Sequence, residues 1–313
     1  MSDFSASALL RLVPLGLKRQ GIDMPVQAPP RGAHMPVEDK RRLLDAVATS
    51  HGESALVRLG EGILDAPDEP VLTAMSLASD PHDLLARWQR LERYVHSKHR
   101  VRIERRTAEG MRLHHVSLRG AAAPLRNEDL LVFGLLIGLL EWVGTRALKA
   151  RFSGERNWRY QHRSWQTATW PEQTGCWELA WSDHDPLLPE TAAVDTPARH
   201  PVPFDCVGEA RNRLALDPAR PWTVKALATE MHVAARSLQR SLARHHSSFS
   251  SLLANVRATS AAHALTTTAQ PLAQIGYACG YADQAHFGRD FKRHTALTPA
   301  QYRAEFSGST QNA

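Results

Sequence analysis

The chain has 313 residues, of which 43% are hydrophobic and 22% are charged, and its formal net charge is +6. This length suits two globular domains, and the composition excludes a largely disordered chain. The three cysteines, Cys176, Cys206 and Cys279, lie far apart and form no CxxC pair and no zinc-type spacing. This pattern excludes a disulfide framework and a structural zinc site, so we expect no metal, no cofactor and a cytoplasmic location.

The net charge belongs to one part of the chain. Residues 206–306 hold 12 Lys and Arg against 6 Asp and Glu, whereas the remainder holds 26 of each. A basic balance in the C-terminal third alone favours a polyanionic partner for that third.

The first part of the chain mixes helical and strand patterns. The spacing of apolar residues predicts helices over 40–50 and 83–98, and alternation predicts strands over 101–106 and 111–118 with a turn at Glu109 and Gly110. Residues 130–140, LLVFGLLIGLL, are too few to cross a bilayer, which needs about 20 residues. They predict a buried helix instead. These elements together predict an α+β domain over residues 1–187.

Two further segments complete this part of the chain. Five of the eight tryptophans fall within residues 158–181. Such rings could line a ligand pocket, but core packing is the preferred interpretation for most of them. Residues 187–203 contain four prolines and few large apolar residues, which predicts an extended linker at 188–203.

Downstream of the linker, one amphipathic pattern occurs twice. Its first copy is a helix with an inward stripe and Thr223 as its cap, then a short break, then a helix over 235–244. About 48 residues later the same spacings return, with Gly280 as the turn residue and a second helix over 283–294. The inward residues are Val224, Leu227, Ala228, Met231, Leu238 and Leu242 in the first copy, and Leu272, Ile275, Gly276, Cys279, Phe287 and Phe291 in the second. This duplication predicts an all-α domain over 204–306 with two helix-turn-helix units, followed by a disordered tail at 307–313.

A long helix is expected between the copies, capped by Ser248 and ended before Pro271. About 20 residues at 1.5 Å each give a spacer on the order of 30 Å, close to the ~34 Å between successive major-groove faces on one side of a duplex. The second helix of each unit could therefore enter adjacent segments of the major groove.

The outward side chains of these helices suit base recognition. Arginine can bond two acceptors of guanine, and glutamine can pair with the edge of adenine. The base-reading candidates are Arg236, Gln239 and Arg240 in the first unit, and Gln284, Ala285, His286 and Arg289 in the second. The candidates for phosphate contacts are Thr223, Arg244, Lys292 and Arg293.

Residues 275–303, IGYACGYADQAHFGRDFKRHTALTPAQYR, resemble the signature of the AraC/XylS family, and residues 227–245 resemble its first unit. The resemblance spans about residues 206–306. It implies double-stranded DNA and RNA polymerase as partners, and activation of transcription. The sequence departs from the family signature at five positions. Ala234 and Ala285 each replace Ser, Ala296 replaces Gly, Tyr281 replaces Phe, and Gly288 lies within a predicted helix.

The first domain is similar to that of an AraC subgroup named for an arabinose-binding-like region. That resemblance implies a small-molecule effector, whose pocket residues are unknown, and a homodimer formed through this domain. Catalytic motifs such as GxSxG and HExxH are missing, and a DNA-repair methyltransferase would need a cysteine cluster upstream of the linker, so we do not expect an enzyme. The alternative is an architectural DNA-binding protein without an effector.

Overall fold

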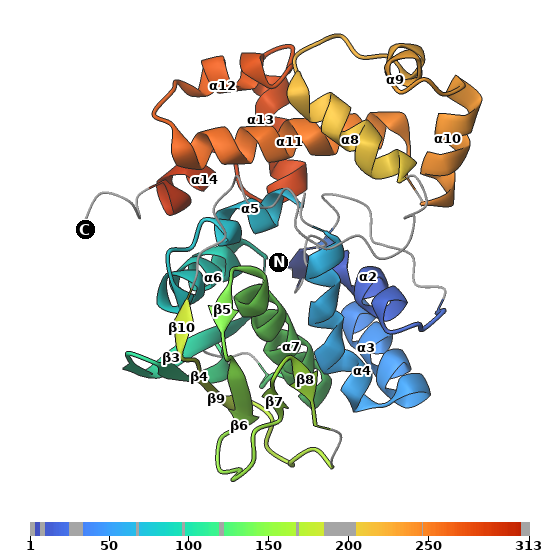
Figure 1. The fold of residues 1–313 in the computed structure, drawn as a ribbon. Helices are drawn as coiled ribbons and strands as arrows, with labels where there is room; N and C mark the ends of the chain where they lie inside the picture. The colour runs from blue at the N-terminus through green and yellow to red at the C-terminus, as the bar shows by residue number, and fades with distance from the viewer. Residues whose placement is uncertain are drawn as a thin grey trace. The chain divides into compact units, whose positions relative to one another are not determined.

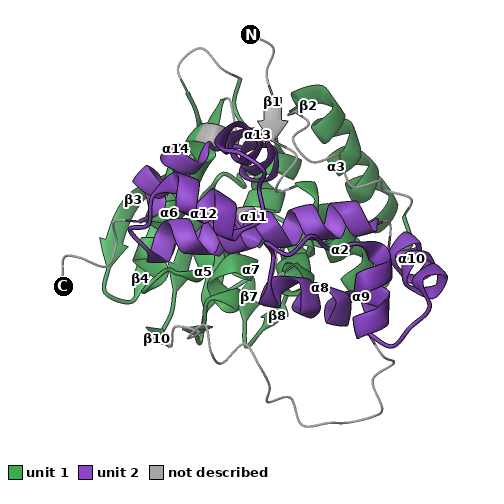
Figure 2. Cartoon of the chain, turned by 90° about the horizontal axis from the view of Figure 1, so that it is seen from above, with its two compact units in different colours: residues 1–67, 75–187 green, residues 68–74, 188–313 purple. Residues whose placement is uncertain are grey.

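The computed structural model describes residues 4–6, 10–24, 34–66, 69–95, 98–118, 122–166, 169–184, 205–245 and 247–307. The chain divides into two compact units, residues 1–67 with 75–187 and residues 68–74 with 188–313 (Figure 2). Residues 68–74 therefore belong with the C-terminal unit, whereas the sequence predicts them in the first domain. One contact explains the difference, because the Tyr302 hydroxyl donates to the Pro70 carbonyl at 3.1 Å. The predicted linker, 188–203, and residues 308–313 lie outside the described residues.

The first unit contains helices and strands, as the sequence predicts. Its helices are α2 (Leu12–Arg19), α3 (Val37–His51), α4 (Glu53–Arg58), the 3-10 helix η1 (Leu59–Asp65), α6 (Pro81–Val95) and α7 (Arg126–Trp142), and the end of α5 (Pro70–Ser76). Its strands are β1 (Phe4–Ala6), β2 (His34–Pro36), β3 (His99–Thr107), β4 (Gly110–Ser117), β5 (Thr145–Arg146), β6 (Lys149–Phe152), β7 (Tyr160–Gln161), β8 (Ser164–Trp165), β9 (Cys176–Ala180) and β10 (Asp183–His184). The turn between β3 and β4 falls at residues 108–109, so Gly110 opens β4 and is not part of the turn.

Six strands form an antiparallel sheet in the order β3-β4-β9-β6-β7-β8. Side chains alternate between the faces of a strand, and on β9 the inward positions Trp177 and Leu179 are buried. The apolar helix α7 lies beside the sheet (Figure 1), and its Phe133 ring stacks on Trp177 with centroids 5.4 Å apart. The core of this unit therefore lies between the sheet and α7.

The opposite side of α7 packs on α4 and η1 at backbone distance. A Cβ atom added at Gly134 would lie 2.0 Å from the Val57 carbonyl oxygen, and one at Gly138 would lie 2.3 Å from that of Gly60. Real Cβ atoms do not come this close, so both positions of α7 must be glycine for the elements to touch.

Helix α6 covers the edge of the sheet. Its Glu92 carboxylate accepts the Val101 N–H of β3 at 2.9 Å and the Trp88 indole N–H at 2.8 Å, and its Gln89 amide donates to the Val101 carbonyl at 2.8 Å. These side chains take the place of a neighbouring strand, which protects the edge from pairing with other chains. Burial raises the pKa of Glu92 to about 8, although the two hydrogen bonds oppose that shift.

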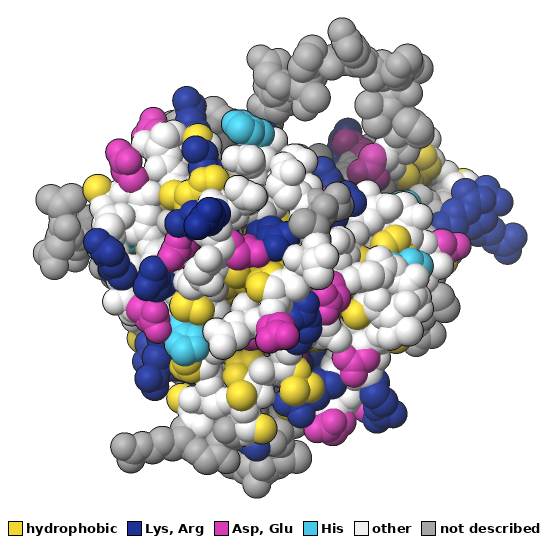
Figure 3. All heavy atoms as spheres, turned by 90° about the horizontal axis from the view of Figure 1, so that it is seen from below, with side chains coloured by type: hydrophobic (Ala, Val, Ile, Leu, Met, Phe, Trp, Pro, Cys, Tyr) yellow, Lys and Arg dark blue, Asp and Glu magenta, His cyan; other side chains and the backbone are white. Residues whose placement is uncertain are grey.

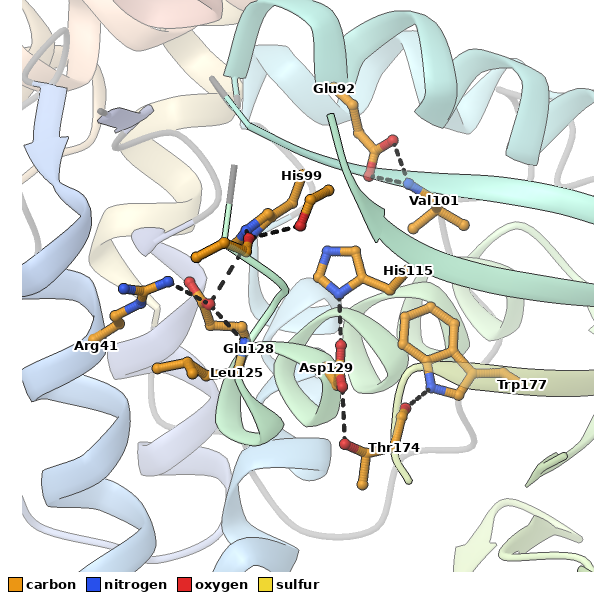
Figure 4. A network of polar contacts seen from close by, with 12 residues as sticks. Arg41, Glu92, His99, Val101, His115, Leu125, Glu128, Asp129, Thr174 and Trp177 are labelled. Carbon is orange, nitrogen blue, oxygen red and sulfur yellow. Dashed lines mark hydrogen bonds and ion pairs between the residues drawn. The ribbon is translucent and has the colours of Figure 1, made fainter. Parts of the chain in front are cut away.

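The first turn of α7 is anchored by two buried acids (Figure 4). Glu128 pairs with Lys40 and Arg41 of α3, and Asp129 bonds His115 of β4 and Thr174 at 2.8 Å each. Burial opposes ionisation of Glu128, yet the adjacent Lys40 ammonium brings its pKa down to about 2. This network ties α3, β4 and the loop before β9 to one end of α7.

The five tryptophans of residues 158–181 have different surroundings. Two of them are buried, two are half-buried beside core phenylalanines, and the half-buried Trp158 lies under the guanidinium of Arg151, which is 4.5 Å from its ring centroid. The buried ones are Trp177 and Trp181, and those beside the phenylalanines are Trp165 and Trp170.

The second unit is helical, as the sequence predicts. Besides the first residues of α5, its described elements are α8 (Cys206–Leu216), α9 (Val224–Glu230), α10 (Ala235–Arg244), α11 (Phe249–Thr267), α12 (Leu272–Ala278), α13 (Gln284–Thr295) and α14 (Pro299–Phe306). In Figures 1 and 2, α9 and α10 lie toward one end of α11, and α12, α13 and α14 lie toward the other. The long helix α11 thus joins two small helical bundles.

Candidate nucleic-acid interface

The first helix-turn-helix unit consists of α9 and α10. Thr223 caps α9 because its hydroxyl accepts the Ala226 N–H at 3.1 Å. Helix α10 begins after Ala234, which provides no side-chain cap, and it buries Leu238 and Leu242. Both predicted helices are present, and α10 has the predicted bounds.

The second unit consists of α12 and α13. Helix α13 is capped by Asp283, whose carboxylate accepts the His286 N–H at 2.7 Å. That bond lowers the pKa of Asp283. Phe287 and Phe291 are buried, as predicted. Helix α12 can pack on α13 because Gly276 faces Phe287, where an added Cβ would lie 2.9 Å from the ring.

The two turns share one backbone conformation. His232 and Gly280, 48 residues apart, both have positive φ, +54° and +80°. In each turn the following N–H bonds a carbonyl five residues earlier, Val233 to Ala228 and Tyr281 to Gly276, both at 3.0 Å. This pairing is a helix C-cap of the Schellman type. The duplication therefore extends from the apolar spacing to individual backbone hydrogen bonds.

The outward stripe of each second helix is accessible. On α10, Arg236, Gln239 and Arg240 are exposed. On α13, Gln284, Ala285 and Arg289 are exposed, whereas His286 is half-buried. The His286 ring packs edge-on against Tyr281 and accepts the Ala282 N–H at 3.4 Å. His286 is thus less available than the other candidates.

The predicted phosphate contacts have more varied surroundings. Arg244 and Lys292 are exposed near the ends of their helices. Arg293 bonds the buried carboxylate of Asp290 while its side chain stays 55% exposed. Thr223 is exposed although its oxygen already caps α9, so its hydroxyl hydrogen is the part that could reach a phosphate.

The helix that separates the units has the expected length. Helix α11 has 19 residues, which corresponds to about 28 Å. Ser248 caps it by accepting the Ser251 N–H at 3.1 Å. The helix ends at Thr267, and Pro271 serves as the N-cap of α12.

Two helices that frame the units were not predicted. Asp205 caps α8 by accepting N–H groups from Val207 and Gly208. Thr298 and Gln301 form a capping box at α14, with Pro299 at its first turn. The T-P-x-Q sequence is a recognisable start signal for a helix, so α14 could have been found from the sequence.

Charge and burial limit the chemistry of this unit. Burial raises the pKa of Cys279 to about 11 and, together with Asp290, raises that of Tyr281. Neither group is therefore ionised at neutral pH. Within the described ranges, no three His, Cys, Asp or Glu side chains are grouped to hold a metal ion. The helices of those same ranges are each too short or too polar to span a membrane.

The surface shown in Figure 3 has a different character from the arginine-bearing helices. Lys and Arg are interspersed there with Asp and Glu, and the residues drawn in colour form no large patch of one sign. The basic excess of the chain lies instead within residues 206–306, which include α10 and α13.

Comparison with known proteins finds similarity for part of the chain. A family model described as "Helix-turn-helix domain" matches residues 227–305. The ornithine utilization regulator of Pseudomonas aeruginosa is 37% identical over 76 residues, which cover 24% of this chain and 22% of that protein. The urease operon transcriptional activator of Escherichia coli is 33% identical over 89 residues, which cover 28% and 30%. The chain thus spans less than a third of either relative.

A solved structure is similar to about a third of the chain. It is a transcriptional regulator from Chromobacterium violaceum, described as containing an AraC-type DNA-binding domain, with 25% identity and a TM-score of 0.32. The match covers 33% of this chain and 94% of that chain. Residues 227–305, which span most of the two helix-turn-helix units, thus match a helix-turn-helix family model, and parts of the chain are similar in sequence to two bacterial transcription regulators.

Proposed function

We propose that the chain is a sequence-specific DNA-binding transcription regulator that acts as an activator under the control of a small-molecule effector. The observation that carries this proposal is the structural duplication. Arg240 on α10 and Arg289 on α13 occupy equivalent exposed positions, and the units that bear them are joined by α11. Two equivalent reading helices on one rigid spacer suit two neighbouring turns of a duplex.

In this proposal the two helices read different bases. Arg236, Gln239 and Arg240 present three hydrogen-bonding side chains from α10. Helix α13 presents Gln284 and Arg289, with the Ala285 methyl group available for thymine and His286 at the edge of the contact.

The remaining candidates hold the phosphate backbone. Thr223 reaches it from the start of α9, Arg244 from the end of α10, and Lys292 and Arg293 from the end of α13. Such contacts fix the orientation of the protein and carry no base preference.

The effector, a homodimer formed through the first domain, and RNA polymerase complete the proposal. Support for transcriptional control comes from the names of the relatives, a utilization regulator and an operon activator. Support for a sensing role comes from the first unit, a separate α+β body. An architectural protein that only coats DNA would need no such unit.

Footprinting of the full chain on promoter DNA tests the proposal. One or a few discrete sites support a regulator, whereas even coverage supports the architectural alternative. Arg240→Ala and Arg289→Ala should each relax base preference in a different groove segment, by about tenfold per contacted base. Arg213→Ala on α8, outside both reading helices, is the matched control. Unchanged preference in both variants would refute the base-reading roles.

A salt titration distinguishes the proposed phosphate contacts from the proposed base contacts. Arg293→Ala should weaken binding to all sequences alike and reduce the slope of log affinity against log salt concentration by about 1. A loss confined to one operator sequence would contradict the phosphate role.

A further inference from the structure

The turn between α12 and α13 contains a buried hydroxyl that packing does not require. Tyr281 is 4% exposed, and its ring packs against Phe287 with centroids 4.9 Å apart. A phenylalanine would make the same ring contact. The Tyr281 hydroxyl is enclosed, and within the described residues it has no hydrogen-bond partner. A buried polar group without a partner destabilises a fold, so this hydroxyl requires a separate explanation.

The group beside this hydroxyl is the carboxylate of Asp290 on α13. Burial raises the pKa of Tyr281, and the negative charge of Asp290 raises it further. The phenol therefore stays protonated at neutral pH and can donate a hydrogen bond. Asp290 is itself only 5% exposed, so water solvates its carboxylate poorly. A donor and an acceptor thus lie close together inside the second helix-turn-helix unit without a bond between them.

Asp290 is instead paired with Arg293, three residues later on the same face of α13. The side chain of Asp290 is 5% exposed and that of Arg293 is 55% exposed, so the ion pair runs from the interior to the surface. His294 Nε2 is 3.9 Å from the same carboxylate oxygen, which is beyond hydrogen-bond distance. Arg293 is therefore the cation that compensates the charge of Asp290 when no DNA is bound.

The proposed phosphate contact of Arg293 competes with this ion pair. While Arg293 stays paired with Asp290, the pair has no net charge and attracts a phosphate only weakly. If Arg293 leaves, it strands a buried carboxylate, and an uncompensated buried charge is strongly unfavourable. A replacement donor lowers this cost, since hydrogen bonds to a charged group are among the stronger ones. The Tyr281 hydroxyl is protonated, adjacent and unpaired, so it can be that donor.

We propose that Arg293 exchanges the Asp290 carboxylate for a DNA phosphate, and that the Tyr281 hydroxyl then donates to Asp290 in its place. Tyr281 is thus a positioning residue, because it acts through Arg293 and touches no DNA itself. The inference rests on the proposed function and deepens it, since it assigns a cause to the phosphate contact of the second unit.

Binding of the full chain to a mixed-sequence DNA duplex tests the exchange, because phosphate contacts need no particular base sequence. Measured by fluorescence anisotropy, Tyr281→Phe should weaken binding about tenfold, the value of one hydrogen bond to a charged group. Its melting temperature without DNA should stay the same or rise, whereas a purely structural role of Tyr281 would lower both quantities. Tyr277→Phe on α12 is the matched control, because Tyr277 is 81% exposed and loses the same hydroxyl. It should change neither quantity.

Further substitutions separate the exchange from other effects of Tyr281. In an Arg293→Ala background, Tyr281→Phe should have no effect on affinity, because no arginine remains to be released. Asp290→Asn should restore the affinity of Tyr281→Phe, because the neutral amide neither retains Arg293 nor needs a donor in exchange. Tyr281→Phe alone should also reduce the slope of log affinity against log salt concentration by up to about 1. A loss that persists without Arg293, or that Asp290→Asn does not restore, would overturn the exchange.

The proposed function and the exchange fail in different ways. If the wild type binds the duplex and Tyr281→Phe binds it equally well, the exchange is overturned and DNA binding stands. If the wild type binds no DNA at all, the proposed function falls and the exchange falls with it.

Discussion

Replacing the two central residues of the β7–β8 turn by Asn-Gly should stabilise the first unit. His162 and Arg163 both have left-handed φ values, and each conformation costs about 1 kcal/mol for a residue with a side chain. The double substitution His162→Asn with Arg163→Gly therefore recovers about 2 kcal/mol. The Arg163–Glu141 ion pair is lost, but the Arg163 side chain is 79% exposed, so this loss is about 0.5 kcal/mol.

The new glycine also makes the unfolded chain more flexible, at a further cost of about 0.5 kcal/mol. The net gain is then about 1 kcal/mol. For a unit of this size that gain raises the melting temperature by roughly 2–4 °C, which differential scanning calorimetry resolves. Gly154→Ala is the control of opposite sign, because Gly154 has φ +90° with nothing within 4 Å; it adds left-handed strain and should lower the melting temperature. A double variant that melts at or below wild type would refute the assignment of strain to this turn.

Three further predictions concern the fold of the two units. Burial raises the pKa of Glu92 to about 8, so between pH 4.5 and 8 the folded chain keeps a proton that the unfolded chain releases. Its free energy of unfolding should therefore fall as pH rises through that window, by at most about 5 kcal/mol, and urea titrations of Glu92→Gln should lack this slope. Gly280→Ala should destabilise the second unit by about 1–3 kcal/mol, because φ is +80° and the new Cβ would lie 2.5 Å from the Pro218 carbonyl oxygen. Gly288→Ala should instead stabilise α13 by up to about 1 kcal/mol, because a Cβ at that position meets nothing within 4 Å. Equal effects of the two substitutions in denaturant titrations would contradict this contrast. Ala234→Asp should add the missing cap of α10 and stabilise this helix by about 1 kcal/mol. Its amide hydrogens should then exchange more slowly, and an unchanged exchange rate would contradict this prediction.

The second unit was predictable because its signals are local. The inward stripes of α9, α10, α12 and α13 repeat every three or four residues, and the Thr223 and Ser248 caps act within three residues. Such short-range features set helix bounds without reference to the rest of the fold. The family resemblance covers these same residues, so it adds little information on the first unit.

The first unit was only partly predictable because much of it is held by distant pairing. Strands β5, β7, β8 and β10 have two residues each, too few to leave an alternation in the sequence. The packing of α7 on η1 depends on Gly134 and Gly138. Their small-xxx-small spacing is visible in the sequence, but it does not indicate which element packs against the helix.

The β7–β8 turn was beyond sequence reasoning for a related reason. Its central residues, His162 and Arg163, both have positive φ, although neither is a residue type that favours this conformation. The turn brings the Arg163 guanidinium to the Glu141 carboxylate, although these residues are 22 positions apart.

The duplicated units share a scaffold but differ on the surfaces that would meet DNA. Helix α10 presents Gln239 where the equivalent position of α13 is Gly288, and α13 starts with the Asp283 carboxylate where α10 has Ala234. The missing side chain at Gly288 is not required by packing, because an added Cβ would meet no atom within 4 Å. Under the proposed function, α10 therefore offers a hydrogen-bonding side chain to the bases at a position where α13 offers none. The first unit then supplies more of the base discrimination, and the second contributes orientation through Lys292 and Arg293.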